Sequence, residues 1–211
     1  MLSEYSVLET CEMSLDAPIP PFTGSMDVDE FMAFLETRPG KEHWELIEGV
    51  AVLMTPASYA HQRITRNFCE LLNSAFSEQH LDLFAYFSAG VRNPGLRNFQ
   101  PEPDVVVVPG VASKNPYSEK FQLAGEIMSP TNTRREIDLK LRRYREGPDN
   151  LYVVVIEPSE FLVEIHARRE SWQPKVLRQP GDTIEMPEFG LRCCVVEIYR
   201  GTSLDPQRRG A

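Results

Sequence analysis

The sequence has few cysteines and no cluster of the residues that bind zinc. Only four cysteines occur among 211 residues, at positions 11, 69, 193 and 194, which is too few for a disulfide scaffold. None belongs to a Cys-x-x-Cys pair, and no histidine lies two to five residues from a cysteine. The spacing of a structural zinc site is therefore missing. We expect reduced thiols and a cytoplasmic protein.

Long apolar runs and an excess of positive charge are also missing. No run of 18 apolar residues is present, so we expect no membrane-spanning segment. The N-terminal region is acidic and lacks the basic flank of a signal or transit peptide. Asp and Glu number 31 against 22 Lys and Arg, giving a formal net charge of −9. Any contact with a phosphate backbone must therefore use a local basic patch.

The length and composition indicate one domain with loose ends. Hydrophobic residues make up 42% and charged residues 25%, as is typical of globular proteins. We expect a flexible leader at 1–24, which contains three prolines and no sustained periodicity, and a folded domain at 25–201. A flexible tail is expected at 202–211.

The spacing of apolar residues predicts a mixed α/β domain. Helices are expected from Asp27 to Pro39, from Ser58 to Gln79 and over 133–146. Two short apolar runs around Gly49 predict a β-hairpin. Further strands are expected at 83–87, 105–108, 121–128, 151–156, 161–165 and 194–199. This order of elements is typical of helices packed on one central sheet.

Two acidic residues adjoin or interrupt apolar strands. Asp104 directly precedes the apolar run 105–108, where a turn aspartate is the plainer interpretation. Glu126 interrupts the run 121–128. A buried glutamate is costly unless it is paired or binds a cation. A buried ion pair or an edge that faces water would explain Glu126 equally well.

Lys140 follows these acids on the next predicted helix. It borders the buried face formed by Ile137, Leu141 and Tyr144. A lone lysine here is typical of a side chain whose stem covers the core edge. Together, two acids and a lysine suit metal-dependent phosphodiester hydrolysis, because Mg²⁺ takes carboxylate ligands and a lysine can orient water or offset phosphate charge.

The order and spacing of these motifs resemble one large protein family. The matching segments are WELIEG at 44–49, AHQR at 60–63, EPDVVVV at 102–108, GEIMSPTNTRREIDLKLRRY at 125–144 and LYVVVIEP at 151–158, followed by FLVEIH. They resemble the restriction-endonuclease-like proteins, abundant in cyanobacteria and other bacteria, of the PD-(D/E)XK nuclease superfamily. The resemblance spans 27–200 and implies a restriction-endonuclease-like core with a central mixed β-sheet flanked by helices.

The resemblance also implies metal ligands. Asp104 would be the acid of the PD element, and Glu126 would be the acid of the (D/E)XK element. The Ile127 carbonyl would be a further ligand. The implied cofactor is Mg²⁺ or Mn²⁺.

Three other residues take roles from the same resemblance. Lys140 would be the catalytic lysine, moved from the strand to the helix, because Met128 stands where the strand lysine is expected. Glu45 would complete a second metal site or a water bridge. His61 would be an accessory contact to the metal shell or the phosphate, although a structural role is the plainer one.

The implied activity is hydrolysis of DNA by a homodimeric endonuclease that leaves 5′-phosphate ends. The basic helix at 133–146 is a candidate phosphate contact, and a solvated cationic face is the alternative. Its predicted DNA-binding residues are Arg134, Arg135, Arg142 and Arg143. A second function is a catalytically silent domain that binds nucleic acid or a protein. That function is favoured if Lys140 points away or Glu126 is locked in a salt bridge.

Overall fold

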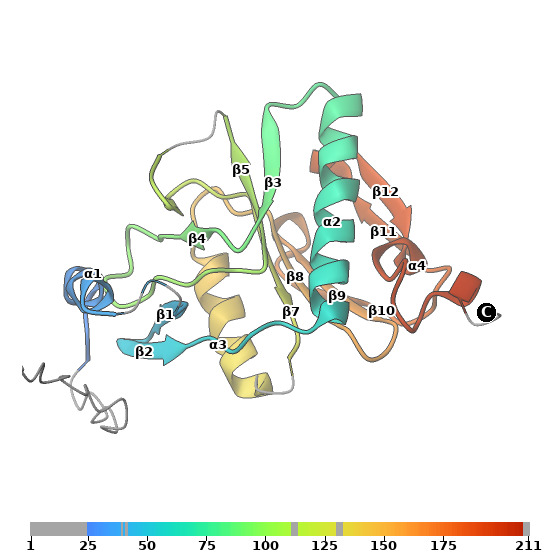
Figure 1. Cartoon of the computed structure of the whole chain (residues 1–211). Helices are drawn as coiled ribbons and strands as arrows, with labels where there is room; N and C mark the ends of the chain where they lie inside the picture. Colours follow the sequence, from blue (N-terminus) through green and yellow to red (C-terminus); the bar gives the residue numbers. More distant parts are fainter. Residues whose placement is uncertain (1–24, 39, 41, 111–113, 130–132, 209–211) are drawn as a thin grey trace, which may run out of the picture.

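The structure is a computed structural model that describes residues 25–38, 40, 42–110, 114–129 and 133–208 (Figure 1). The predicted leader at 1–24 lies outside the described residues. Within the predicted tail, Thr202 and Asp205 are buried and Pro206–Arg208 form a 3-10 turn. The boundary at residue 201 stays a prediction. No helix in the described part of the chain is long and apolar enough to cross a membrane.

A six-stranded mixed β-sheet lies at the centre, with the strand order β10-β9-β8-β7-β5-β3. Its strands are β3 (Leu83–Phe87), β5 (Val105–Pro109), β7 (Leu123–Ile127), β8 (Tyr152–Glu157), β9 (Leu162–Ala167) and β10 (Pro174–Leu177). Within this sheet, β7 and β8 are parallel and are joined through α3 (Arg134–Arg145), and the other neighbours are antiparallel. The predicted central mixed sheet is thus confirmed.

One long helix covers each face of this sheet (Figure 1). Side chains alternate across a strand, so Val105 and Val107 of β5 pack in the core beneath α2 (Tyr59–Glu78). Val106 of the same strand packs with α3 on the opposite face. Because both faces are covered there, the central strands β5 and β8 are nearly continuous apolar runs.

Smaller elements lie around this core. A hairpin of β1 (Trp44–Ile47) and β2 (Val50–Leu53) turns at Glu48 and Gly49, which have φ of 50° and 79°, as expected for a two-residue hairpin turn. The others are α1 (Val28–Glu36), β4 (Gly90–Val91), β6 (Tyr117–Ser118), η1 (Arg168–Glu170), β11 (Thr183–Met186), η2 (Pro187–Phe189) and β12 (Leu191–Cys194). Asp27, Ser58 and Thr133 cap the helices that were expected to begin beside them.

The predicted strand at 194–199 is wrong. β12 ends at Cys194, and Val195–Ile198 form the short helix α4. The Cys194 amide donates to the Glu197 carboxylate over 2.8 Å, which satisfies a free amide of the first helical turn. A short apolar run fits a buried strand and a buried helical turn equally well, so its pattern alone does not separate them.

Candidate active site

Two adjacent strands bring the predicted acids together. The register pairs Val105 of β5 with Gly125 of β7, which places Asp104 opposite Glu126 at one end of the antiparallel pair. Glu126 is buried, and Asp104 keeps 22% of its side chain exposed. Asp104, which was expected just before a strand, therefore lies beside Glu126, which was expected within the next strand.

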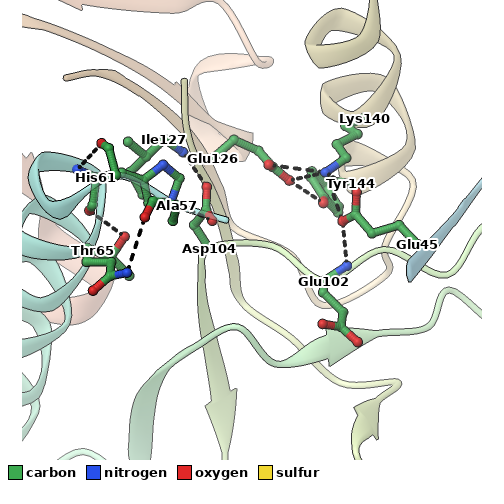
Figure 2. A network of polar contacts seen from close by, with 12 residues as sticks. Glu45, Ala57, His61, Thr65, Glu102, Asp104, Glu126, Ile127, Lys140 and Tyr144 are labelled. Atoms are coloured by element: carbon green, nitrogen blue, oxygen red, sulfur yellow. Dashed lines mark hydrogen bonds and ion pairs between the residues drawn. The ribbon is translucent and has the colours of Figure 1, made fainter. Parts of the chain in front are cut away.

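Both carboxylate oxygens of Asp104 are engaged. The Nε2 atom of His61 lies 2.9 Å from one oxygen, and the Ile127 amide donates to the other over 2.7 Å. His61 lies in the first turn of α2, where its own amide donates to the Ser58 hydroxyl. Asp104 lies between His61 and the group around Glu126 (Figure 2), so its orientation is set from a helix and a strand at once.

Lys140 of α3 lies between two buried glutamates. Its Nζ atom is 2.8 Å from a Glu45 oxygen and 3.2 Å from a Glu126 oxygen (Figure 2). The Tyr144 hydroxyl donates to Glu126 over 2.6 Å, and the Glu102 amide donates to Glu45 over 2.8 Å. Lys140 is only 5% exposed, so it does not carry its charge into water at the core edge.

Burial and neighbouring charges shift the titration of this cluster. Burial raises the pKa of Glu126 to about 7; the Lys140 ammonium opposes this rise, and the Asp104 carboxylate adds to it. Burial alone would lower the pKa of Lys140, but Glu126 and Glu45 outweigh it, so that the pKa is raised and the ammonium stays protonated. Burial also raises the pKa of Tyr144, which keeps its hydroxyl a hydrogen-bond donor.

Most of these side chains line one cavity of about 380 Å³, whereas Tyr144 lies behind its wall. The polar wall contains Glu45, His61, Asp104, Glu126, Ile127 and Lys140, together with Glu136. The opposite wall is apolar and comes from β2 and the segment after it, including Val50, Leu53 and Pro56. The structure thus brings together the six residues that the sequence assigned to metal binding and catalysis.

The donor set of the cavity fits a hard divalent cation. The cavity lining carries four carboxylates, those of Glu45, Asp104, Glu126 and Glu136, and a single lysine ammonium, which favours a cation. In the described part of the chain, no group of three His, Cys, Asp or Glu side chains is arranged as a metal site. Two carboxylates completed by main-chain and water oxygens suit Mg²⁺, which commonly keeps several waters and binds only one or two protein carboxylates.

Three of the four predicted DNA-binding arginines, Arg134, Arg135 and Arg142, line one hollow, whereas Arg143 lies outside it. Arg143 pairs with Glu48 of the β1–β2 turn through two contacts of 2.5 and 2.8 Å. Arg134 forms two 3.0 Å hydrogen bonds to Glu164 of β9. Arg135 and Arg142 have no ion pair with the residues that the structure describes.

Sequence reasoning missed the polar role of Tyr144. Its position on the buried face of α3 indicated a core residue, and most of its ring does pack there. The spacing of four residues from Lys140 was the available signal, because residues four apart are neighbours on a helix surface. A hydroxyl one turn beyond a buried lysine can reach the same carboxylate.

Comparison with solved structures supports the architecture. A central mixed sheet flanked by helices, with paired acids at one end of two strands, is the expected restriction-endonuclease-like core. The crystal structure of a putative nuclease belonging to DUF820 from Anabaena variabilis ATCC 29413 superposes with a TM-score of 0.65 at 17% identity. The match covers 82% of this chain and 97% of that one, and it shows a shared fold.

The family follows from the sequence itself. Residues 28–195 match the Uma2 family, which is described as "Putative restriction endonuclease". The match covers well over half of the chain, so this protein belongs to the Uma2 family, and the resemblance expected from its motifs is confirmed. The comparison with curated proteins gives no match.

Proposed function

We propose that this protein is a divalent-metal-dependent endonuclease that hydrolyses DNA phosphodiester bonds. The observation that carries the proposal is the convergence of Asp104, Glu126 and Lys140 on one cavity, from two strands and a helix. Membership of a family described as "Putative restriction endonuclease" supports it. Mg²⁺ or Mn²⁺ is the proposed cofactor.

Asp104, Glu126 and the Ile127 carbonyl would hold the metal. When bound, the metal would act as a Lewis acid and lower the pKa of a coordinated water. His61 and the Ile127 amide fix the orientation of Asp104. Since His61 is directed at Asp104, we assign it a positioning role rather than direct contact with the phosphate.

Lys140 stabilises negative charge in this proposal. A protonated ammonium donates hydrogen bonds to a phosphate oxygen as charge builds up in the transition state. In the metal-free protein Glu126 and Glu45 raise the pKa of Lys140, which favours a charged hydrogen-bond donor over a base for the attacking water. Both oxygens of Glu45 are occupied by Lys140 and the Glu102 amide, which favours a role in holding Lys140 over a second metal site.

The bond changes follow from hydrolysis by water. A water oxygen attacks phosphorus in line, the bond to the 3′ oxygen breaks, and the product strand carries a 5′-phosphate. A homodimer would bring one such site to each strand of a duplex, so we propose a homodimer. Light scattering of the purified protein measures its molar mass in solution and so distinguishes a dimer from a monomer.

The metal site can be tested without knowledge of the target sequence. We expect calorimetric titration of Mn²⁺ into the wild type to show saturable binding, and Asp104→Asn and Glu126→Gln to lose it. Glu185→Gln is the matched control, because Glu185 lies on β11 and pairs with Arg192 outside the cavity. Saturable binding that survives both cavity substitutions would contradict the assignment of these ligands.

One observation favours the catalytically silent alternative. Glu126 is engaged by both Lys140 and Tyr144, and a metal would have to compete with these contacts. A wild-type protein that binds no Mn²⁺, with or without DNA, would make a nuclease-like binding domain the better assignment. Mn²⁺ binding that is lost in Glu126→Gln would show that Lys140 and Tyr144 do not keep the Glu126 carboxylate from the metal, and it would count against the silent alternative.

A further inference from the structure

A second hollow lies on the other flank of α3, away from the active-site cavity. It has a volume of about 590 Å³ and is bordered by α3, β9 and the segment after η1. Four arginines of α3 line it, together with His166 and Trp172. The active-site cavity is lined by other residues of α3, namely Glu136, Ile137 and Lys140. We call the second hollow the arginine groove.

Positive charge is in excess in the arginine groove. Its lining contains the carboxylates of Asp138 and Glu164, and both pair with Arg134. The other arginines of the groove, at positions 135, 142 and 145, form no ion pair within 4.0 Å of a described carboxylate. In a chain with a formal net charge of −9, this concentration of unpaired guanidinium groups is a local basic patch.

The base of the groove is a buried polar relay. Glu164 and His166 are 8% and 3% exposed, and the His166 Nε2 atom lies 2.6 Å from a Glu164 oxygen. The His166 Nδ1 atom lies 2.8 Å from the Arg145 guanidinium and 3.1 Å from the Trp172 carbonyl oxygen. The ring thus contacts Glu164, Arg145 and the Trp172 backbone at once, and these contacts fix the position of Arg145 at the base of the groove.

Trp172 forms an aromatic border beside these arginines. Ser171 and Trp172 both have left-handed backbone conformations, with φ of 54° and 62°, which are uncommon for residues other than glycine. The Trp172 amide donates to the Ala167 carbonyl, and the Arg168 guanidinium lies 5.4 Å from the ring centre. An aromatic ring among arginines is typical of surfaces that bind nucleic acid.

We propose that the arginine groove binds the phosphodiester backbone of DNA, a few nucleotides away from the phosphate that is cut. This inference rests on the proposed nuclease function. The body of α3 separates the groove from the cavity, and a helix with side chains is about 10–12 Å wide. That width corresponds to about three steps along one strand of B-DNA. DNA would then lie across α3, with the scissile phosphate at Lys140.

The proposal changes which arginines are expected to contact DNA. Arg135, Arg142 and Arg145 make the contacts, whereas Arg134 is held by Glu164 and Asp138. Arg143 pairs with Glu48 and does not line the groove. Arg145 is added to the proposed contacts because it lines the groove, where it is held by His166 of β9.

Fluorescence anisotropy tests the groove. A labelled short duplex is titrated with protein at several salt concentrations, with Ca²⁺ replacing Mg²⁺ to avoid cleavage. We expect Arg142→Gln/Arg145→Gln to weaken binding and to lower the salt slope by about two, one per lost phosphate contact. Arg135→Gln/Arg142→Gln should do the same and leaves the buried relay intact. Arg192→Gln is the control, because Arg192 is an exposed arginine of β12 paired with Glu185.

Mn²⁺ titration of the same variants separates this inference from the proposed function. Retained metal binding with a reduced salt slope supports both. Wild-type DNA binding whose slope is unchanged in both double variants would overturn the groove and leave the metal site standing. DNA binding with a reduced slope but no metal binding would support the groove alone. A wild type that binds no DNA, or that binds only a matched RNA duplex, would overturn the assignment to DNA.

Discussion

The two flanks of α3 use positive charge in opposite ways. On the cavity side, Lys140 is buried between Glu45 and Glu126, and carboxylates outnumber the cation. On the groove side, arginines outnumber carboxylates, and Arg145 at the base of the groove contacts His166. One helix of 12 residues thus borders an acidic cavity that suits a metal cation and a basic groove that suits phosphate.

The difference follows from the chemistry of the two cations. A lysine ammonium is a compact point charge that fits between two carboxylates, whereas an arginine guanidinium spreads its donors over a plane and suits phosphate recognition. Lys140 has lost almost all contact with water, while Arg142 is exposed. We therefore expect substitutions on the cavity side to affect folding and chemistry, and those on the groove side to affect affinity for DNA.

The largest expected effect is that of Lys140→Met. Removal of the ammonium leaves Glu45 and Glu126 buried without their partner, and breaking a buried pair in this way costs about 3–5 kcal/mol. Urea unfolding of the metal-free protein measures the loss. Arg142→Met is the counterpart on the groove side, where an exposed substitution should change stability by less than about 0.5 kcal/mol. Equal losses in the two variants would contradict the contrast between the flanks.

An effect of pH is expected from Glu126. Its pKa is raised from 4.5 to about 7 in the folded protein, so the folded state holds the proton more tightly than the unfolded state does. Its contribution to stability is complete below pH 4.5 and is lost as the pH rises through about 7. Mn²⁺ binding should tighten over the same range, because the metal takes the carboxylate form. Glu126→Gln should remove this part of the pH dependence of stability; an unchanged profile would show that another group causes it.

A smaller effect is expected for Tyr144→Phe. The substitution keeps the ring in the core and removes a hydrogen bond to a buried carboxylate, which is worth about 1.5–3 kcal/mol when the partner is charged. Partners that orient metal ligands typically change metal affinity by about 10–100-fold. Calorimetry should show weaker Mn²⁺ binding. Tyr152→Phe, which removes a hydroxyl bonded to Glu188 outside the cavity, should leave the metal affinity unchanged.

Local sequence was sufficient to predict the elements that carry the site. Asp104 precedes a strand that is apolar at every position, and Thr133 caps the helix that carries Lys140. These signals lie within a few residues of the elements that they define. The structure places Asp104 and Lys140 in one cavity because the β5–β7 register and the β7-α3-β8 connection leave little freedom at that end of the sheet.

The partners of the charged side chains could not be predicted in the same way. Lys140 meets Glu45, and Arg143 meets Glu48, from elements 95 residues away. The helical pattern gives the face on which Arg145 lies, but His166 comes from a strand paired on the far side of β8. Whether an arginine is free to bind phosphate depends on such long-range pairs. The set predicted from sequence, which includes Arg134 and Arg143, therefore differs from the set proposed from the structure, which includes Arg145.

Single-turnover cleavage in Mn²⁺ tests most directly whether the two flanks of α3 serve one reaction. Plasmid DNA offers many candidate sites and so lessens the dependence on an unknown target. We predict that Lys140→Gln lowers the cleavage rate at saturating protein, whereas Arg135→Gln/Arg142→Gln keeps that rate and raises the protein concentration needed to reach it. A wild-type rate in Lys140→Gln, or a lowered saturating rate in the arginine variant, would contradict this division between chemistry and DNA binding.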